Sequence, residues 1–263
     1  MPFTLAHPAA VLPIHSKWKR WLSLAPLVVG SMIPDAAYYL PVPDHFRQNA
    51  HGLLRGLFFS VPAGIAVLLI FYWLAPELAF LLPSPHREAL GRRIDGPALS
   101  LRTAWLAVCG IVIGAETHVA LDSFAHSNGW MVERIRFLRE PIMRVHPYFA
   151  LQLLSSVAGI AILLYVYDRW AMTEGFRVWT LREVSWRSLL WAGVFIGCLV
   201  PAMIESHTIR EITTFPFPLS RRFAVILTTS FIQNVMMAVC AVALCIKLVS
   251  RRSRLDAAYS SQS

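Results

Sequence analysis

The stretch Gly114–Trp130, GAETHVALDSFAHSNGW, closes an apolar run that begins near Arg102. Within this stretch, His118, Asp122 and His126 recur at every fourth position. On an α-helix each step of four residues advances about 40° around the axis, so the three side chains share one face, with neighbours about 5–6 Å apart. Imidazole and carboxylate groups at this spacing can bind one divalent cation, as the two histidines of the HExxH helix do. The stretch therefore predicts an apolar helix with a metal-binding face near its end.

The composition is typical of an integral membrane protein. The chain has 263 residues, of which 56% are hydrophobic and only 15% are charged, and its mean hydropathy is +0.54. In a soluble protein, the net charge of +9 would favour nucleic acid as a partner. Here the basic residues lie in short loops between apolar runs, where they can face lipid headgroups. We therefore expect the lipid bilayer, and no nucleic acid, as the partner of this chain.

Five apolar runs are near the length of about 20 residues that crosses a bilayer as a helix. They are approximately Leu53–Trp73, Thr103–Ser123, Tyr148–Tyr167, Leu189–Ile204 and Phe223–Val249. The earlier run Leu22–Pro34 is too short to cross and predicts a re-entrant or interfacial helix. The expected fold is an all-α, multi-pass transmembrane bundle of about five spans plus this short N-terminal helix. We expect one membrane domain over 1–249 and a polar, disordered tail over 250–263.

With five spans, the N-terminal segment and the loops after spans two and four lie on the same side of the membrane. Polar residues gather at that side, whereas His86 is the one histidine that clearly maps to the other. The gathered residues include His7, Asp35, His51, His118, Asp122, His126, His146, Glu205 and His207. Lys and Arg divide equally between the two sides in this layout, so the positive-inside rule gives no orientation.

Several motifs resemble a bacterial membrane family catalogued as domain of unknown function 4184. The resemblance rests on the start MPFTLAHPA, the run Gly30–Asp35, the entry His51–Leu54, and the His118-xxx-Asp122-xxx-His126 helix followed by Gly129-Trp130. It extends over the chain as far as about span five. Membership implies a multi-pass protein of the bacterial inner membrane, with no established activity.

More distantly, the early histidine, the Pro-Asp pair and the HxxxD helix are similar to predicted membrane-bound metal-dependent hydrolases. This group is sometimes linked to zinc-dependent phospholipase C and the S1/P1 nucleases. The likeness implies metal ligands at His7, Asp35, His51, His118 and Asp122, with His126 as an added ligand. The chain departs from the phospholipase pattern, because it has no recognisable N-terminal Trp ligand and only one HxxxD, so the number of metals stays open.

The chemistry that such a site would support is hydrolysis. Zinc with one open position lowers the pKa of its bound water to about 7 and polarises a phosphoryl or carbonyl oxygen. Asp122 is the first catalytic candidate, and Glu205 is a second, as a base or extra ligand. The site would be ringed by Trp130, Tyr148, Arg134, Arg136, Arg139 and Arg144. These residues favour an anionic lipid headgroup or a lipid-linked phosphate as substrate.

Three functional classes stay open at this point. The first is the metal-dependent hydrolase, and the second is a transporter or proton pathway that uses the same His and Asp cluster. The third is a non-catalytic structural or partner-binding membrane protein, in which His118, Asp122 and His126 form a polar packing network between helices. In that case the pair Pro34-Asp35 would simply end and cap a helix.

Overall fold

A computed structural model describes residues 3–39, 43, 45, 49–91, 100–143, 145–176, 185–212 and 221–260. This part of the chain is helical, with an isolated bridge between Ile142 and Val145 and no strand. Its elements are η1 (Thr4–Ala6), α1 (Pro8–Trp18), α2 (Leu24–Tyr39), α4 (Leu57–Leu81), α5 (His86–Gly91), α6 (Leu101–Ala125), α7 (Trp130–Arg134), α8 (Arg136–Arg139), α9 (Pro147–Thr173), α10 (Trp186–Ile212) and α11 (Arg221–Ser260). They form two compact units, Met1–Ile70 with Gly96–Gly175, and Phe71–Asp95 with Phe176–Ser263. The prediction of one membrane domain over 1–249 stays a prediction.

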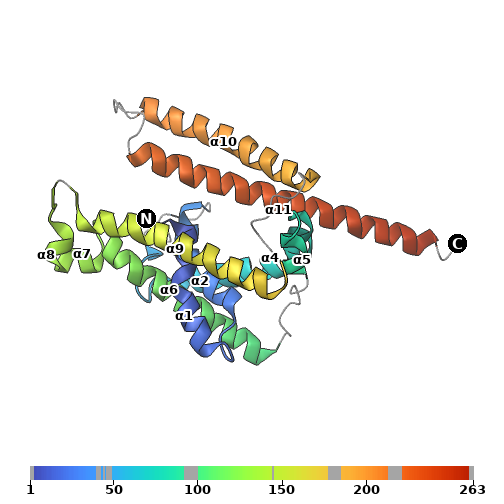
Figure 1. Ribbon diagram of the computed structural model, residues 1–263, viewed down its shortest axis with the longest axis horizontal. Coiled ribbons are helices and arrows are strands. Elements are labelled where there is room, and N and C mark those ends of the chain that lie inside the picture. Colours follow the sequence, from blue (N-terminus) through green and yellow to red (C-terminus); the bar gives the residue numbers. More distant parts are fainter. Residues whose placement is uncertain are drawn as a thin grey trace. The chain divides into compact units, whose positions relative to one another are not determined.

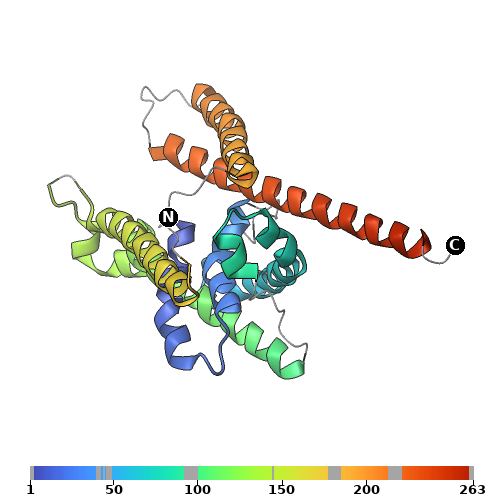
Figure 2. The ribbon, with the colours of Figure 1, turned by 45° about the vertical axis from the view of Figure 1, so that its right-hand side comes forward.

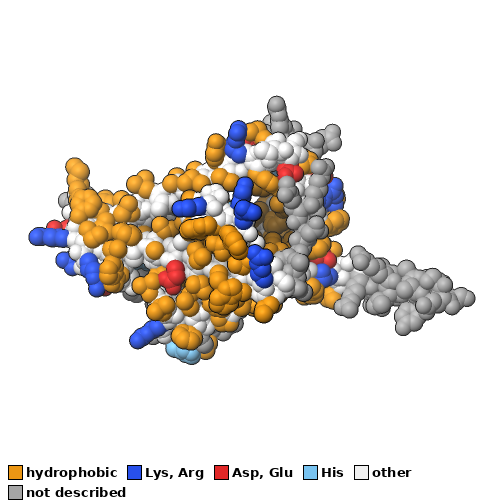
Figure 3. Space-filling view, turned by 90° about the horizontal axis from the view of Figure 1, so that it is seen from below, with side chains coloured by type: hydrophobic (Ala, Val, Ile, Leu, Met, Phe, Trp, Pro, Cys, Tyr) orange, Lys and Arg blue, Asp and Glu red, His pale blue; other side chains and the backbone are white. Residues whose placement is uncertain are grey.

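Within the described part of the chain, five segments are long and apolar enough to cross a membrane, which agrees with the predicted bundle of about five spans. They are Leu57–Leu81, Leu101–Arg134, Pro147–Thr173, Trp186–Ile204 and Ser230–Ser250. Much of the surface seen in Figure 3 consists of hydrophobic side chains, as expected for helices that face lipid. The shorter apolar helix α2 agrees with the predicted short N-terminal helix.

In the first unit, α2 packs closely along α6, and glycines make the close approach possible. The blue helix α2 lies against the green helix α6 in Figures 1 and 2. A Cβ atom at Gly30 would collide with the carbonyl oxygen of Ile111, and one at Gly114 would collide with the backbone of Leu27. Gly110 and Gly114 form the GxxxG spacing that lets membrane helices approach through their backbones. This packing brings the end of α2 beside the end of α6.

Replacing Gly114 by leucine is expected to push α2 away from α6. The new side chain would meet the Ser31 backbone nitrogen, 2.6 Å from the position of its Cβ, and backbone cannot rotate aside. We expect a stability loss of about 1–3 kcal/mol, which a thermal unfolding scan in detergent would measure. The matched control is Gly193→Leu in α10, because no atom lies within 4 Å of a Cβ at Gly193. Equal melting temperatures for the two variants would contradict this packing.

The end of α2 differs from the sequence prediction, because the helix does not stop at Pro34. Pro34 lies inside α2, which continues to Tyr39. The last turn is held by packing, since Ala37 forms a buried cluster with Ala50 and Phe59. Asp35 is therefore a buried residue within a helix, and the reading of Pro34-Asp35 as a helix stop is wrong.

The N-terminal segment is fixed beside α9 and leads directly into α1. The backbone nitrogen of Phe3 donates to the Ser156 hydroxyl oxygen at 2.9 Å, and Gly159 leaves room for the backbone of Ala6. His7 follows as the N-cap of α1 and is 2% exposed. The early histidine is therefore held in the interior of the first unit.

Helix α6 carries its own start and stop signals. Ser100 and Thr103 form a capping box at its beginning, and His126 takes an extended conformation at its end. The two ends of α6 are also flanked by arginine–tryptophan pairs. Arg102 lies over the Trp21 ring at 5.3 Å, and Arg134 lies over the Trp130 ring at 4.0 Å.

The second unit contains the end of α4, together with α5, α10 and α11. Leu74, Leu81 and Ala243 form its buried cluster. An ion pair joins Lys247 to Glu77 at 3.1 Å, so two charges in apolar helices neutralise each other. Helix α11 runs to Ser260, in contrast to the disordered tail expected from residue 250. Extending an existing helix avoids the cost of nucleation, and the Arg, Leu and Ala residues in this tail favour helix.

Candidate metal centre

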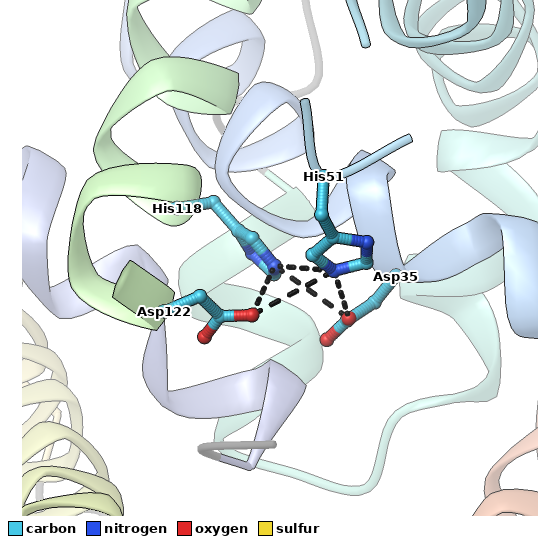
Figure 4. A group of neighbouring side chains, drawn as sticks. All are labelled: Asp35, His51, His118 and Asp122. Carbon is cyan, nitrogen blue, oxygen red and sulfur yellow. Dashed lines mark hydrogen bonds and ion pairs between the residues drawn. The ribbon is translucent and has the colours of Figure 1, made fainter. Parts of the chain in front are cut away.

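Four side chains from three parts of the first unit converge at the end of α6. His118 and Asp122 come from α6, Asp35 comes from the last turns of α2, and His51 precedes α4 (Figure 4). Each offers one ligand atom, and these four atoms all lie within 4.8 Å of one another. Asp35 and His118 are fully buried, Asp122 is 6% exposed and His51 is partly exposed. Because these four residues could together hold a metal ion, we call them the metal centre.

Five distances among the ligand atoms of the metal centre are close to those between ligands that share one metal ion. Asp35 Oδ1 lies 3.1 Å from His51 Nε2 and 3.5 Å from His118 Nε2. Asp122 Oδ2 lies 3.6 Å and 3.4 Å from the same two nitrogens, which are 3.3 Å apart. Nitrogen and oxygen ligands about 2.0–2.1 Å from zinc in a tetrahedron lie about 3.3–3.4 Å from one another. The metal centre thus has donor types and distances that could hold a divalent metal ion.

A backbone hydrogen bond sets the direction in which His118 presents its lone pair. His118 Nδ1 lies 2.8 Å from the carbonyl oxygen of Ser31, which can only accept, so Nδ1 carries the proton. The neutral ring then has its lone pair on Nε2, the atom that faces Asp35 and Asp122. Metal-binding histidines are commonly oriented by such a bond from their other nitrogen.

Each carboxylate keeps one oxygen for the metal centre and has the other held from outside it. The Thr4 hydroxyl donates to Asp35 Oδ2 at 2.6 Å, whereas Asp35 Oδ1 faces the two imidazoles. His7 Nε2 lies 3.3 Å from Asp122 Oδ1, whereas Asp122 Oδ2 faces the imidazoles. Both carboxylates are therefore oriented by the N-terminal segment, at positions 4 and 7.

The two buried carboxylates need a compensating positive charge. Taking a carboxylate out of water costs several kcal/mol, and two close carboxylates repel each other in addition. Among the described residues, no Lys or Arg is paired with Asp35 or Asp122. Their compensation must come from the surrounding imidazoles in their protonated form or from a bound cation.

His7 and His126, which were predicted as ligands, lie beside the metal centre and outside the four-residue group. His126 Nε2 lies 3.2 Å from Asp122 Oδ2, and the His7 ring stacks on His118 with 3.9 Å between centroids. His126 ends α6 and borders a cavity. The structure thus brings all six predicted metal ligands together, four of them as the metal centre and two as neighbours of Asp122.

Within the described part of the chain, the other predicted site residues are not found at the metal centre. The side chain of Glu205 lies outside the described part of the chain, as does Arg144. Of the remaining arginines, Arg134 lies in α7, and Arg136 and Arg139 lie in α8, but none of them lines the cavity. Tyr148 contacts the ring of His146.

A cavity of about 870 Å³ leads to the metal centre. His51, Asp122 and His126 are among the residues that line it. Its remaining walls are largely apolar and come from Tyr38, Gly52, Leu53, Val119, Ala120, Ser123, Asn128, Gly129, Trp130, Met131 and Glu133. A cavity with apolar walls and a few convergent polar groups is the usual form of a small-molecule site.

The family model described as "Domain of unknown function (DUF4184)" matches residues 1–249. The chain belongs to this family. The match supports the family resemblance read from the sequence, and it covers both the metal centre and all five candidate spans. No curated protein matches the chain. No solved structure matches it either.

Two residues that support the metal centre in this DUF4184 member were missed by sequence reasoning. Thr4 is a single hydroxyl residue in an apolar start, and Ser31 contributes only its backbone carbonyl oxygen. A backbone group carries no residue-specific signal. The GxxxG spacing in α6 was a usable signal for the close approach of another helix, since small residues mark such contacts.

Proposed function

We propose that this membrane protein binds one divalent metal ion, zinc in the first instance, and hydrolyses a phosphoester of a lipid or lipid-linked substrate. The observation that carries the proposal is the convergence of Asp35 Oδ1, His51 Nε2, His118 Nε2 and Asp122 Oδ2, which all lie within 4.8 Å of one another. Two nitrogen and two oxygen donors are ligands that zinc accepts. A cation at this point would also compensate both buried carboxylates.

With the four residues as ligands, a bound divalent cation that expands to five-coordination would polarise a phosphoryl oxygen or lower the pKa of a bound water molecule to about 7. The chain supplies the orientation, because Thr4, His7 and Ser31 hold three of the four ligand residues in place. His126 lies where the cavity meets Asp122, so its imidazole is placed to take or give a proton during hydrolysis. Asp122 thus contacts both the other ligand residues and His126, the proposed proton-transfer residue.

The position of the metal centre along α6 supports a lipid substrate. Twenty residues separate Arg102 from Asp122, which is about 30 Å of helix and close to the thickness of the hydrocarbon layer. The pair Arg102–Trp21 therefore marks one membrane surface, and Trp130–Arg134 marks the surface beside the metal centre. A phosphate at this depth belongs to a headgroup of the adjacent leaflet.

The charge of the cavity favours a headgroup with a single phosphodiester. Its described walls include Glu133 and no Lys or Arg, so a bound cation would be the main attraction for phosphate. Additional phosphates on a headgroup would meet the Glu133 carboxylate without a basic partner. We therefore expect faster hydrolysis of lipids with one phosphate than of lipids with several.

His126→Ala is expected to lower turnover about 10²- to 10⁴-fold while most of the metal stays bound. The reason is that His126 borders the cavity but lies outside the four ligand residues. The assay follows release of the phosphate-containing headgroup from phospholipid in proteoliposomes, beside metal content in the same preparation. The control is His146→Ala, because His146 Nδ1 donates to the Arg139 carbonyl and the residue does not line the cavity.

Each outcome of this assay has a distinct meaning. Wild-type protein that contains metal but releases no headgroup would refute hydrolysis and keep the metal centre. Turnover that is unchanged in His126→Ala would remove the proton-transfer role of His126. Turnover that survives complete removal of metal by a chelator would overturn the proposed mechanism.

A further inference from the structure

One wall of the cavity belongs to a segment with an unusual surface. This segment, Trp130–Val145, contains α7 and α8 and connects α6 to α9. It is anchored to the unit by Val132, which is fully buried, and by Leu138, which is 6% exposed. Other large apolar side chains of the segment are exposed, with Phe137 at 65% and Met143 at 94%. The remaining exposed apolar residues are Trp130, Ile135, Ile142 and Val145.

The exposed apolar side chains are held outward by a fixed backbone. Ile142 and Val145 exchange two backbone hydrogen bonds of 2.9 Å, so Met143 lies at the tip of a closed turn. In α8, Leu138 points inward while its neighbour Phe137 is exposed. The apolar surface is therefore part of the folded unit, and water is a poor solvent for it.

Basic side chains border this apolar surface. The described part of the segment contains three arginines, at positions 134, 136 and 139, and two glutamates. Arg136 is paired with Glu140, and Arg134 lies over the Trp130 ring. At the left-hand end of Figure 3, where Figure 1 places α7 and α8, hydrophobic and basic side chains lie next to one another. Apolar residues for the acyl chains and arginines for phosphates match the layered structure of a bilayer surface.

The neighbouring helices place the segment at that surface. The candidate span through α6 reaches Arg134, and the candidate span of α9 begins at Pro147. The segment therefore overlaps the end of one candidate span and stops just before the start of the next. Trp130 at its start is the residue type that anchors helices at the headgroup layer.

We propose that Trp130–Val145 lies in the headgroup layer with Phe137 and Met143 among the acyl chains, so that the cavity opens to lipid. The cavity walls agree with this, since exposed apolar Leu53, Tyr38 and Trp130 border it. A lipid would enter sideways, with its headgroup toward the metal centre and its chains remaining in the bilayer. The proposal rests on the proposed function only where it names a lipid as the molecule that enters.

The test is the depth of single positions in proteoliposomes. An environment-sensitive fluorescent amino acid is incorporated at Met143, at Phe137 or at Leu53, which keeps the four native cysteines unchanged. The control position is Glu140, an exposed and charged neighbour in the same segment. Quenching is measured with phospholipids brominated near the top of the acyl chain and with iodide in the water phase.

We expect loss of fluorescence with brominated lipid at 143, 137 and 53, and loss with iodide at 140. Iodide quenching at 143 and 137 equal to that at 140 would overturn the proposal. Shielding from both quenchers would also overturn it, because a protein partner or second copy would then cover the segment. Insertion at 143 but not at 53 would refute entry from the lipid. None of these measurements depends on bound metal or on turnover. A negative quenching result would therefore refute lipid entry without contradicting metal binding by the metal centre.

Discussion

Replacing His118 by alanine is expected to weaken binding of a divalent metal by more than about 100-fold. Loss of an outer-shell partner typically costs 10–100-fold in metal affinity, and His118 is a direct ligand in the proposed centre. It is fully buried, and its Nε2 lies within 3.5 Å of Asp35 Oδ1, Asp122 Oδ2 and His51 Nε2. Affinity would be measured by competition with a chromophoric zinc chelator, using protein in detergent.

The control is His15→Ala, which removes a histidine with the same local bonding. His15 Nδ1 donates to the Leu22 carbonyl at 2.9 Å, much as His118 does to Ser31, but His15 lies in α1 outside the metal centre. We expect His15→Ala to bind metal like the wild type. Equal affinities for His118→Ala and the wild type would contradict the assignment of His118 as a ligand.

Asp122→Asn is expected to remove the thermal stabilisation that metal gives to the wild type. Metal at 100 times its Kd stabilises the folded state by about 2.7 kcal/mol, or roughly 5–10 °C for a chain of this size. A chelator should therefore lower the melting temperature of the wild type by that amount and leave Asp122→Asn unchanged. Asp122 contacts four imidazoles, at His7, His51, His118 and His126.

This substitution separates a metal site from a polar packing network. Asparagine keeps the size of the side chain and one hydrogen-bonding oxygen, so a network would lose only part of its strength. In a network without metal, the chelator would change neither protein. The control is Asp168→Asn in α9, which should respond to the chelator as the wild type does. An equal response of Asp122→Asn and the wild type would show that Asp122 is not a ligand.

The membrane spans could be predicted from the sequence because crossing the hydrocarbon layer requires a helix of a definite length and composition. A helix must present about 20 apolar residues to cross, and five such runs stand out. The helix ends were less predictable, since a helix continues beyond its apolar run wherever local residues allow it. Helix α11 does so as far as Ser260. Tertiary packing decided the end of α2, where Ala37 is buried against Ala50 and Phe59 despite Pro34.

The candidate site was predictable to the extent that its residues follow a pattern. The spacing of His118 and Asp122 places them on one helix face. Asp35 and His51 were included as candidate ligands because of the family resemblance and because they map to the same side of the membrane. Which oxygen or nitrogen each residue presents could not be read from the sequence. Those orientations depend on Thr4, His7 and Ser31, which approach from other segments only when the chain is folded.

The most direct test is the metal content of the wild-type protein, purified in detergent without added metal or chelator and measured by inductively coupled plasma mass spectrometry. The four convergent ligand residues predict a near-stoichiometric divalent ion, with zinc the first candidate, and its loss in both His118→Ala and Asp122→Asn. Folded wild-type protein that holds no divalent metal, and that acquires none on dialysis against zinc, would contradict the metal centre. The cluster of Asp35, His51, His118 and Asp122 would then be a network that fixes helix packing.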